Sequence, residues 1–198
     1  MPPRLILASG SPRRSQLLGL LGLAFEVRPV DLDEPPHPGE DPVVYVERLA
    51  REKAEAHAHP GELVLAADTT VFLDREILGK PEDPDDARRM LRRLSARTHQ
   101  VATGVALHDR ATARTVAHVD RTPVTFRALT EAEIDWYVAT GEPMDKAGAY
   151  AIQGAAGLFI THIEGVPSNV VGLPLPTVGH LFEELGLDVL DHQNHKGT

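Results

Sequence analysis

Apolar residues along the chain follow two alternating patterns. Short runs of consecutive apolar residues are typical of buried strands, and apolar residues that recur every three or four positions indicate one face of a helix. The runs predict strands at 4–8, from residue 25, and at 62–74, 98–109, 113–127 and 157–165. The helical spacing predicts helices that start near residues 12, 42, 84, 131 and 174. Because helices alternate with strands, the pattern predicts an α/β fold.

Local start signals support the predicted helices. Three of the helices begin with a capping side chain followed directly by proline, which suits the first helical position. These pairs are Ser11–Pro12, Asp41–Pro42 and Asp83–Pro84, and Thr130 with Glu133 has the spacing of a capping box. The strand-like segments 98–109 and 113–127 flank a polar turn, so we expect them to pair as a hairpin.

The organisation of the chain is simple. No repeat or low-complexity linker occurs, so we expect one domain over residues 1–190 and a flexible tail at 191–198. The chain contains no cysteine, which excludes a disulfide framework and thiolate chemistry. The apolar run near the N-terminus is too short for a signal peptide, and no segment has membrane-spanning length. We therefore expect a soluble, cytoplasmic protein that does not bind membranes.

Charge narrows the function classes. The chain has 20 Lys and Arg against 29 Asp and Glu, a net charge of -9, which argues against stable nucleic-acid binding because that requires a basic face. An acidic protein can still bind a small polyanion at a local site, with a divalent cation that mediates the contact. Ten histidines are present without HExxH spacing. We expect those in polar segments to be exposed, namely His57, His59, His192 and His195.

The segment from Ser9 to Arg14 places small residues, a proline and two arginines at the start of the first helix. A helix N-terminus carries partial positive charge, so arginine is unfavourable there unless an anion is bound. Free backbone N–H groups and the Ser9 and Ser11 hydroxyls are suited to phosphate oxygens. Arg13 and Arg14 add fork-shaped donors of the same kind. The alternative is a capped helix with two exposed arginines; we favour a phosphate site.

Asp68 interrupts an otherwise apolar strand, with Val64–Ala67 before it and Val71–Leu73 after it. Aspartate is depleted in strands, and a buried carboxylate is costly unless it is paired or bound to a metal. Asp68 is therefore a candidate metal ligand, or a base that accepts a proton from water. The alternative is a strand end with a solvated side chain.

Further charged residues indicate a function less specifically. Asp31, Asp33 and Glu34 follow a strand, and their oxygens fit Mg²⁺ or Mn²⁺, although a solvated acidic loop has the same composition. Lys53 continues the inner face of its helix and either points into a site or extends to the rim. Lys80 lies at a turn before a proline. Charges and small residues mix from 142 to 154, which fits either a ligand contact or a plain glycine-rich loop.

Six separated motifs together resemble the Maf family, nucleotide pyrophosphatases also known as septum formation inhibitors. The motifs are ASGSPRR near the start, REKA at 51–54, AADTTV at 66–71, GKP at 79–81, DKAGAYAIQG at 145–154 and VVGLPL at 170–175. One departure is Ala151, where glycine is common in the family. The resemblance implies an α/β fold with a long twisted mixed β-sheet flanked by helices, and two lobes with an active-site cleft between them.

The resemblance also implies an activity and its residues. Members hydrolyse a nucleoside triphosphate between its α and β phosphates, with a divalent cation, Mg²⁺ or Mn²⁺. The family's catalytic aspartate falls on Asp68, and its metal ligands fall on Glu34 and Asp68. The implied phosphate-binding residues are Ser9, Arg13, Arg14, Lys53 and Lys80. The positions associated with substrate choice fall on Arg13, Thr69 and Gln153.

Glutamine at position 153 resembles the branch that acts on dTTP and UTP, whereas a sister branch acting on 7-methyl-GTP typically carries glutamate there. We therefore expect a dTTP/UTP pyrophosphatase, and family membership implies a homodimer. One alternative is a pyrophosphatase for 7-methyl-GTP or another purine nucleotide. The other is a non-catalytic, nucleotide-binding regulator of cell division. Whether the role is nucleotide-pool cleansing or septum formation stays open at the level of sequence.

Overall fold

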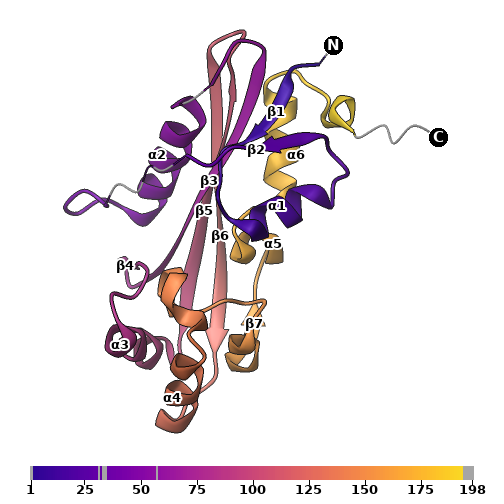
Figure 1. Ribbon diagram of the computed structural model, residues 1–198. Coiled ribbons are helices and arrows are strands. Elements are labelled where there is room, and N and C mark those ends of the chain that lie inside the picture. The colour runs from indigo at the N-terminus through magenta and orange to yellow at the C-terminus, as the bar shows by residue number, and fades with distance from the viewer. Residues whose placement is uncertain (1, 31, 33–34, 57, 194–198) are drawn as a thin grey trace. The chain divides into compact units, whose positions relative to one another are not determined.

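The computed structural model of the protein describes residues 2–30, 32, 35–56 and 58–193 (Figure 1). A mixed seven-stranded sheet has the strand order β2-β1-β3-β5-β6-β7, and β4 pairs with β3. The expected α/β fold with a mixed sheet is confirmed. The chain divides into two compact units, and β3, β5 and β6 contribute residues to both. The first unit is Met1–Asp68, Thr103–Asp120 and Gly172–Thr198; the second is Thr69–Ala102 and Arg121–Val171.

The first unit is an α/β layer structure. Its strands are β1 (Arg4–Leu7), β2 (Phe25–Val27) and parts of β3 (Glu62–Leu73), β5 (Thr98–Asp109) and β6 (Arg114–Phe126). Its helices are α1 (Pro12–Gly19), α2 (Pro42–Glu55), α6 (Leu175–Glu184) and the 3₁₀ segment η4 (Val189–His192). β1 is parallel to both neighbours, with Leu7 opposite Val27 of β2 and Leu65 of β3. β1 and β3 therefore run in the same direction, and β1 ends opposite Leu65, while β3 continues to Leu73.

Two apolar cores cover the two faces of this part of the sheet, because successive residues of a strand face opposite sides. Leu5 of β1 packs in the core shared with α1 and α6, and Ile6 packs in the core shared with α2, which contributes Ala50. Helix α2 lies very close to β5. A Cβ added at Gly104 would lie 2.3 Å from the backbone oxygen of Val46, so only glycine permits this approach.

The second unit has its own core, built around aromatic residues. Besides the remaining parts of β3, β5 and β6, it contains β4 (Glu76–Leu78), α3 (Pro84–Leu94), α4 (Glu131–Ala139), η1 (Glu142–Asp145), η2 (Ala147–Ala149), η3 (Ala155–Phe159), β7 (Ile160–Ile163) and α5 (Pro167–Val171). Phe126, Tyr137, Tyr150 and Phe159 are buried together with the apolar faces of α3 and α4. β7 pairs antiparallel with β6, and a register shift lies at Thr125/Phe126.

Most of the predicted helix starts are confirmed. Asp41 accepts a hydrogen bond from Val43 N, Asp83 accepts one from Asp86 N, and Thr130 forms a complete capping box with Glu133. The expectation for Ser11 is wrong in one respect: its backbone has the N-cap conformation, but its side chain makes no capping bond. The 3₁₀ segments, β4 and α5 are too short to produce a recognisable period in the sequence.

The expectation that His192 is exposed is also wrong. Its side chain is buried, and its ring lies 5.3 Å from that of Phe182 between centroids. The next residue, Gln193, forms an isolated antiparallel bridge with Leu23. His59 is exposed as expected, whereas His57 and His195 lie outside the described residues. Within the part of the chain that the structure describes, no helix has both the length and the apolar character to cross a membrane.

Candidate functional site

The turn between β1 and α1 holds Arg14 in a fixed position. Ser9, at the carboxyl end of β1, is buried, and its Oγ accepts hydrogen bonds from Ser11 N at 3.3 Å and Arg14 Nη1 at 3.1 Å. Arg14 Nε also donates to the backbone oxygen of Gly172 at 2.8 Å. The serine hydroxyl therefore orients the guanidinium at the first turn of α1.

Asp68 lies in the middle of the neighbouring strand β3, just beyond the point where β1 ends. Ala8 N donates to Leu65 O at 2.8 Å, so β1 and β3 stay paired up to the residues that precede Ser9 and Asp68. Residues Glu62 to Ala67 of β3 are buried, and Asp68 is the first that is partly accessible. The parallel register thus brings Asp68 near the start of α1, although the two segments are far apart in the sequence.

Lys53 completes this group from the last turn of α2. Its Nζ lies 2.6 Å from Asp68 Oδ1, and the two side chains are only 13% and 16% exposed. Of the two alternatives for Lys53, the structure therefore excludes extension to the rim. The apolar stripe on α2 fixes this direction, because Ala50 and Ala54 lie on the buried face on either side of Lys53.

Charged side chains of both signs meet in this group. Burial lowers the pKa of the Arg14 guanidinium, the charge of Asp68 opposes this shift, and the neighbouring charge of Arg13 adds to it. Among the described residues, Lys53 pairs with Asp68, Arg14 feels the charge of Asp68, and Arg13 adds a further positive charge beside Arg14. Confining like charges is unfavourable unless an anion neutralises them. The group has the composition of a binding site for a multiply charged anion.

The other expected site residues belong to the second unit. Thr69 follows Asp68 on β3 and is half-buried. Lys80 and Gln153 are both exposed. Gly79 accepts a hydrogen bond from Gly148 N at 3.0 Å, which joins the GKP turn to the 145–154 segment within this unit. Glu34, the expected metal ligand, lies outside the described residues, as do Asp31 and Asp33.

A network of hydrogen bonds that holds the segment carrying Gln153 was not predicted from the sequence. Tyr137 OH donates to Glu142 Oε1 at 2.7 Å and accepts from Ala151 N at 3.2 Å, and Glu142 Oε2 accepts from Ala155 N at 3.1 Å. Gly154 lies against the same carboxylate, since an added Cβ would be 2.0 Å from Glu142 Oε1. The available sequence signal was the tyrosine itself, because a buried tyrosine hydroxyl requires a partner.

The donor set near Asp68 fits a hard divalent cation. Lys53 engages Oδ1 of the carboxylate, so Oδ2 is the atom suited to a metal. Mg²⁺ and Mn²⁺ commonly take one or two protein carboxylates and complete their shell with substrate phosphate oxygens and water. No His or Cys of the described residues joins Asp68 in a metal-ligating group, which disfavours softer ions at this place.

The fold and the site define a class of protein, namely an α/β protein with a group of cationic side chains beyond the carboxyl end of β1, suited to phosphate oxygens. A family model described as Maf-like protein matches residues 4–185, and the chain belongs to this family. The expected membership is thereby confirmed.

Curated relatives of high similarity carry one name. A protein of Anaeromyxobacter dehalogenans (strain 2CP-C) named dTTP/UTP pyrophosphatase is 58% identical over 188 residues, 94% of this chain and 96% of the relative. A protein of the same name from Myxococcus xanthus is 56% identical over 92% of this chain and 93% of the relative. A third, from Chromobacterium violaceum, is 52% identical over 94% of this chain and 96% of the relative.

Proposed function

We propose that the protein hydrolyses dTTP and UTP to the nucleoside monophosphate and pyrophosphate. The names of relatives that are 52–58% identical over nearly the full chain support this activity. The structural observation that carries it is the Lys53–Asp68 pair close to Arg14 and Arg13, because these cationic side chains are suited to the phosphate oxygens of a triphosphate. In this proposal the phosphates of the substrate supply the negative charge that makes two arginines favourable at a helix N-terminus.

In this proposal the cations bind the phosphate chain. Arg14, held by Ser9 and Gly172, is oriented before substrate arrives, so little side-chain entropy is lost on binding. The Ser9 hydroxyl and backbone N–H groups in the first turn of α1 add donors. Arg13 and Lys53 contribute further charge, and we assign Lys80 to the same task on family grounds.

Asp68 accepts a proton in the chemical step. The oxygen of a water molecule bonds to the α-phosphorus, and the bond between the α-phosphorus and the oxygen that bridges it to the β-phosphorus breaks. The bridging oxygen keeps the electron pair and leaves with the pyrophosphate, while the water proton goes to the Asp68 carboxylate. The ion pair with Lys53 fixes the orientation of this carboxylate. A divalent cation held by Asp68 and Glu34 would spread charge on the phosphate oxygens.

Selection of a pyrimidine base is assigned to Arg13, Thr69 and Gln153. The amide of Gln153 is neutral and can both donate and accept hydrogen bonds, which suits an uncharged pyrimidine edge. A carboxylate at the same position would favour the cationic ring of 7-methylguanine. The substitution Gln153→Glu is therefore expected to shift substrate preference towards 7-methyl-GTP. An unchanged preference would show that Gln153 does not determine selectivity.

The primary experiment measures pyrophosphate release with Mg²⁺ or Mn²⁺ from dTTP, UTP, CTP, GTP, ATP and 7-methyl-GTP. Asp68→Asn is assayed in parallel, with Asp74→Asn as the matched control, because Asp74 is an exposed aspartate just after β3 that pairs with Arg97. We expect release from dTTP and UTP, its loss in Asp68→Asn, and no loss in Asp74→Asn. Nucleotide binding without release from any substrate would favour a non-catalytic regulator.

We also propose that the protein acts in the cytoplasm as a homodimer, on the basis of the family resemblance. Light scattering coupled to size-exclusion chromatography measures the mass directly, to be compared with the 21.5 kDa of one chain. A mass near one chain at micromolar concentration would contradict the dimer without affecting the proposed activity.

A further inference from the structure

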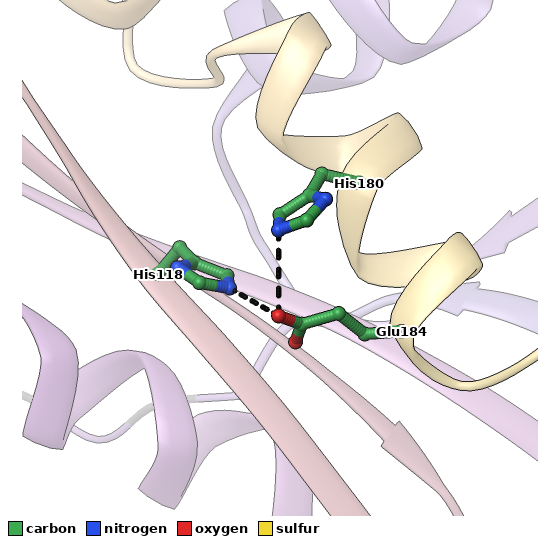
Figure 2. A group of neighbouring side chains, drawn as sticks. All are labelled: His118, His180 and Glu184. Carbon is green, nitrogen blue, oxygen red and sulfur yellow. Dashed lines mark hydrogen bonds and ion pairs between the residues drawn. The ribbon is translucent and has the colours of Figure 1, made fainter.

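A second group of convergent side chains lies in the first unit and uses none of the residues proposed for hydrolysis. His118 projects from β6, and His180 and Glu184 project from α6 (Figure 2). His180 and Glu184 are four positions apart, which places them one turn apart on the same helix face. The strand residue His118 faces both of them, so three potential ligands from two elements meet at one point.

The distances within this group are short. His118 Nε2 lies 2.8 Å and His180 Nε2 lies 3.3 Å from the same atom, Glu184 Oε1. One ligand atom from each of the three residues can be chosen so that all lie within 4.8 Å of one another. Ligand atoms about 2.0–2.2 Å from a tetrahedral zinc ion are separated by about 3.3 Å. Small side-chain rotations are therefore sufficient to place all three around one ion.

The charges around the group also suit a cation. The Glu184 carboxylate supplies negative charge within the group. Glu183 Oε2 is 3.8 Å from His180 Nδ1, and Asp120, two positions after His118 on β6, contacts Thr177 of α6. Arg114 donates to the Glu184 backbone oxygen at 3.2 Å, not to its carboxylate.

We propose that His118, His180 and Glu184 form a binding site for a divalent transition-metal ion of the zinc class. Two imidazoles and one carboxylate are a ligand set found in open zinc sites. Imidazole nitrogen favours zinc, copper, nickel and cobalt, whereas magnesium prefers oxygen ligands, so this site and the Asp68 group select different ions. The side chains are 34–53% exposed, which leaves a coordination position open to water or to an exchangeable ligand.

The bound ion would connect β6 to α6. Without an ion, β6 and α6 are joined here by hydrogen bonds of His118 and Arg114 with Glu184 and of Thr177 with Asp120, and those at exposed positions compete with water. An ion bound by the folded protein and not by the unfolded chain stabilises the fold in proportion to the logarithm of its free concentration. The bound ion would thus stabilise the packing of α6 against β6 and take no part in the proposed hydrolysis.

The test uses the untagged full chain without nucleotide, so it does not depend on the proposed activity. Zn²⁺ is titrated by calorimetry at pH 7.5, and Co²⁺ is added separately because its visible absorption reports coordination geometry. The variants are His118→Ala, His180→Ala and Glu184→Gln, with His162→Ala as the control. His162 is an exposed histidine of β7 in the second unit.

We expect one Zn²⁺ per chain with micromolar affinity, a Co²⁺ spectrum of a four- or five-coordinate site, and a higher unfolding temperature with Zn²⁺. Each ligand variant should weaken binding at least about 10-fold, as loss of a ligand removes a metal bond, and His162→Ala should leave binding unchanged. Circular dichroism checks that the variants are folded, and Glu184→Gln keeps the shape of the side chain. The proposal is overturned if no Zn²⁺ binds, or if binding survives in the His118→Ala/His180→Ala double variant.

Discussion

Lys53 Nζ lies 2.6 Å from Asp68 Oδ1, so α2 supplies the direct partner of the carboxylate proposed as the base. The two residues come from a helix and a strand that share a buried core, and both side chains are largely enclosed. This relationship makes the position of α2 on the sheet a requirement for the site. The first two predictions follow from it.

Replacement of Lys53 by methionine removes the ion pair and one phosphate-binding charge while keeping the length of the side chain. We expect kcat/KM for dTTP to fall by about 100-fold or more, the usual cost of removing one stabilising donor from an active site. Arg51→Met is the matched control, because Arg51 lies on the same helix and pairs with Glu47 at the surface. Activity of Lys53→Met close to that of Arg51→Met would contradict the assignment.

Replacement of Gly104 by alanine should displace α2. The added Cβ would lie 2.3 Å from Val46 O and 2.8 Å from Glu47 N, and these are backbone atoms that cannot rotate away. We expect a loss of about 2–3 kcal/mol in the free energy of unfolding, as in other overpacked cores, together with reduced activity. Gly19→Ala is the control, since nothing lies within 4 Å of its added Cβ. Equal stability of the two variants in urea unfolding would refute the close contact.

Burial of His99 predicts a dependence of stability on pH. His99 is 1% exposed, and desolvation lowers its pKa to about 4. Because the folded pKa is below the unfolded value of about 6.5, the stabilisation is complete above pH 6.5 and is lost as the pH falls towards 4. The loss should be about 2 kcal/mol by pH 5.

The variant His99→Gln tests this dependence, because glutamine keeps a hydrogen-bonding group for Tyr150 OH, which lies 2.7 Å from His99 Nε2, but does not titrate. Urea unfolding between pH 7.5 and pH 5 should show a smaller slope in the variant than in the wild type. Identical slopes would mean that His99 is protonated without cost in the fold.

Disruption of the Tyr137–Glu142 pair should loosen the segment that carries Gln153. Gly154→Ala places a Cβ 2.0 Å from Glu142 Oε1 and forces this carboxylate away from its donors. We expect a loss of about 1–2 kcal/mol in stability and a smaller preference for dTTP over GTP. Gly157→Ala is the control in the same segment, since its nearest contact is an ordinary 3.5 Å. Unchanged preference with reduced stability would limit the network to a structural role.

The sequence predicted the features that depend on neighbours within a few residues. Asp41, Asp83 and Thr130 cap helices as expected, because each accepts from a backbone N–H only two or three positions ahead. Asp68 stood out because a charge inside an apolar strand is anomalous wherever the strand lies. The cap at Ser11 was predicted wrongly: its backbone has the N-cap conformation, but its side chain accepts no capping bond, and nothing in the structure explains the difference. His192 was predicted wrongly because the ring that covers it, Phe182, belongs to another element.

The family, the order of the elements and the list of charged candidates were thus present in the sequence by itself, because periodicity, caps and motifs are local properties of a chain. Tertiary structure alone decided which candidates meet. The parallel register of β1 and β3 brings Ser9 near Asp68, and the approach of α2 to the sheet turns Lys53 towards the same carboxylate. Likewise, His118 and Glu184 are 66 positions apart and join only because α6 packs beside β6. Such pairings depend on register and packing distance, which no local pattern encodes.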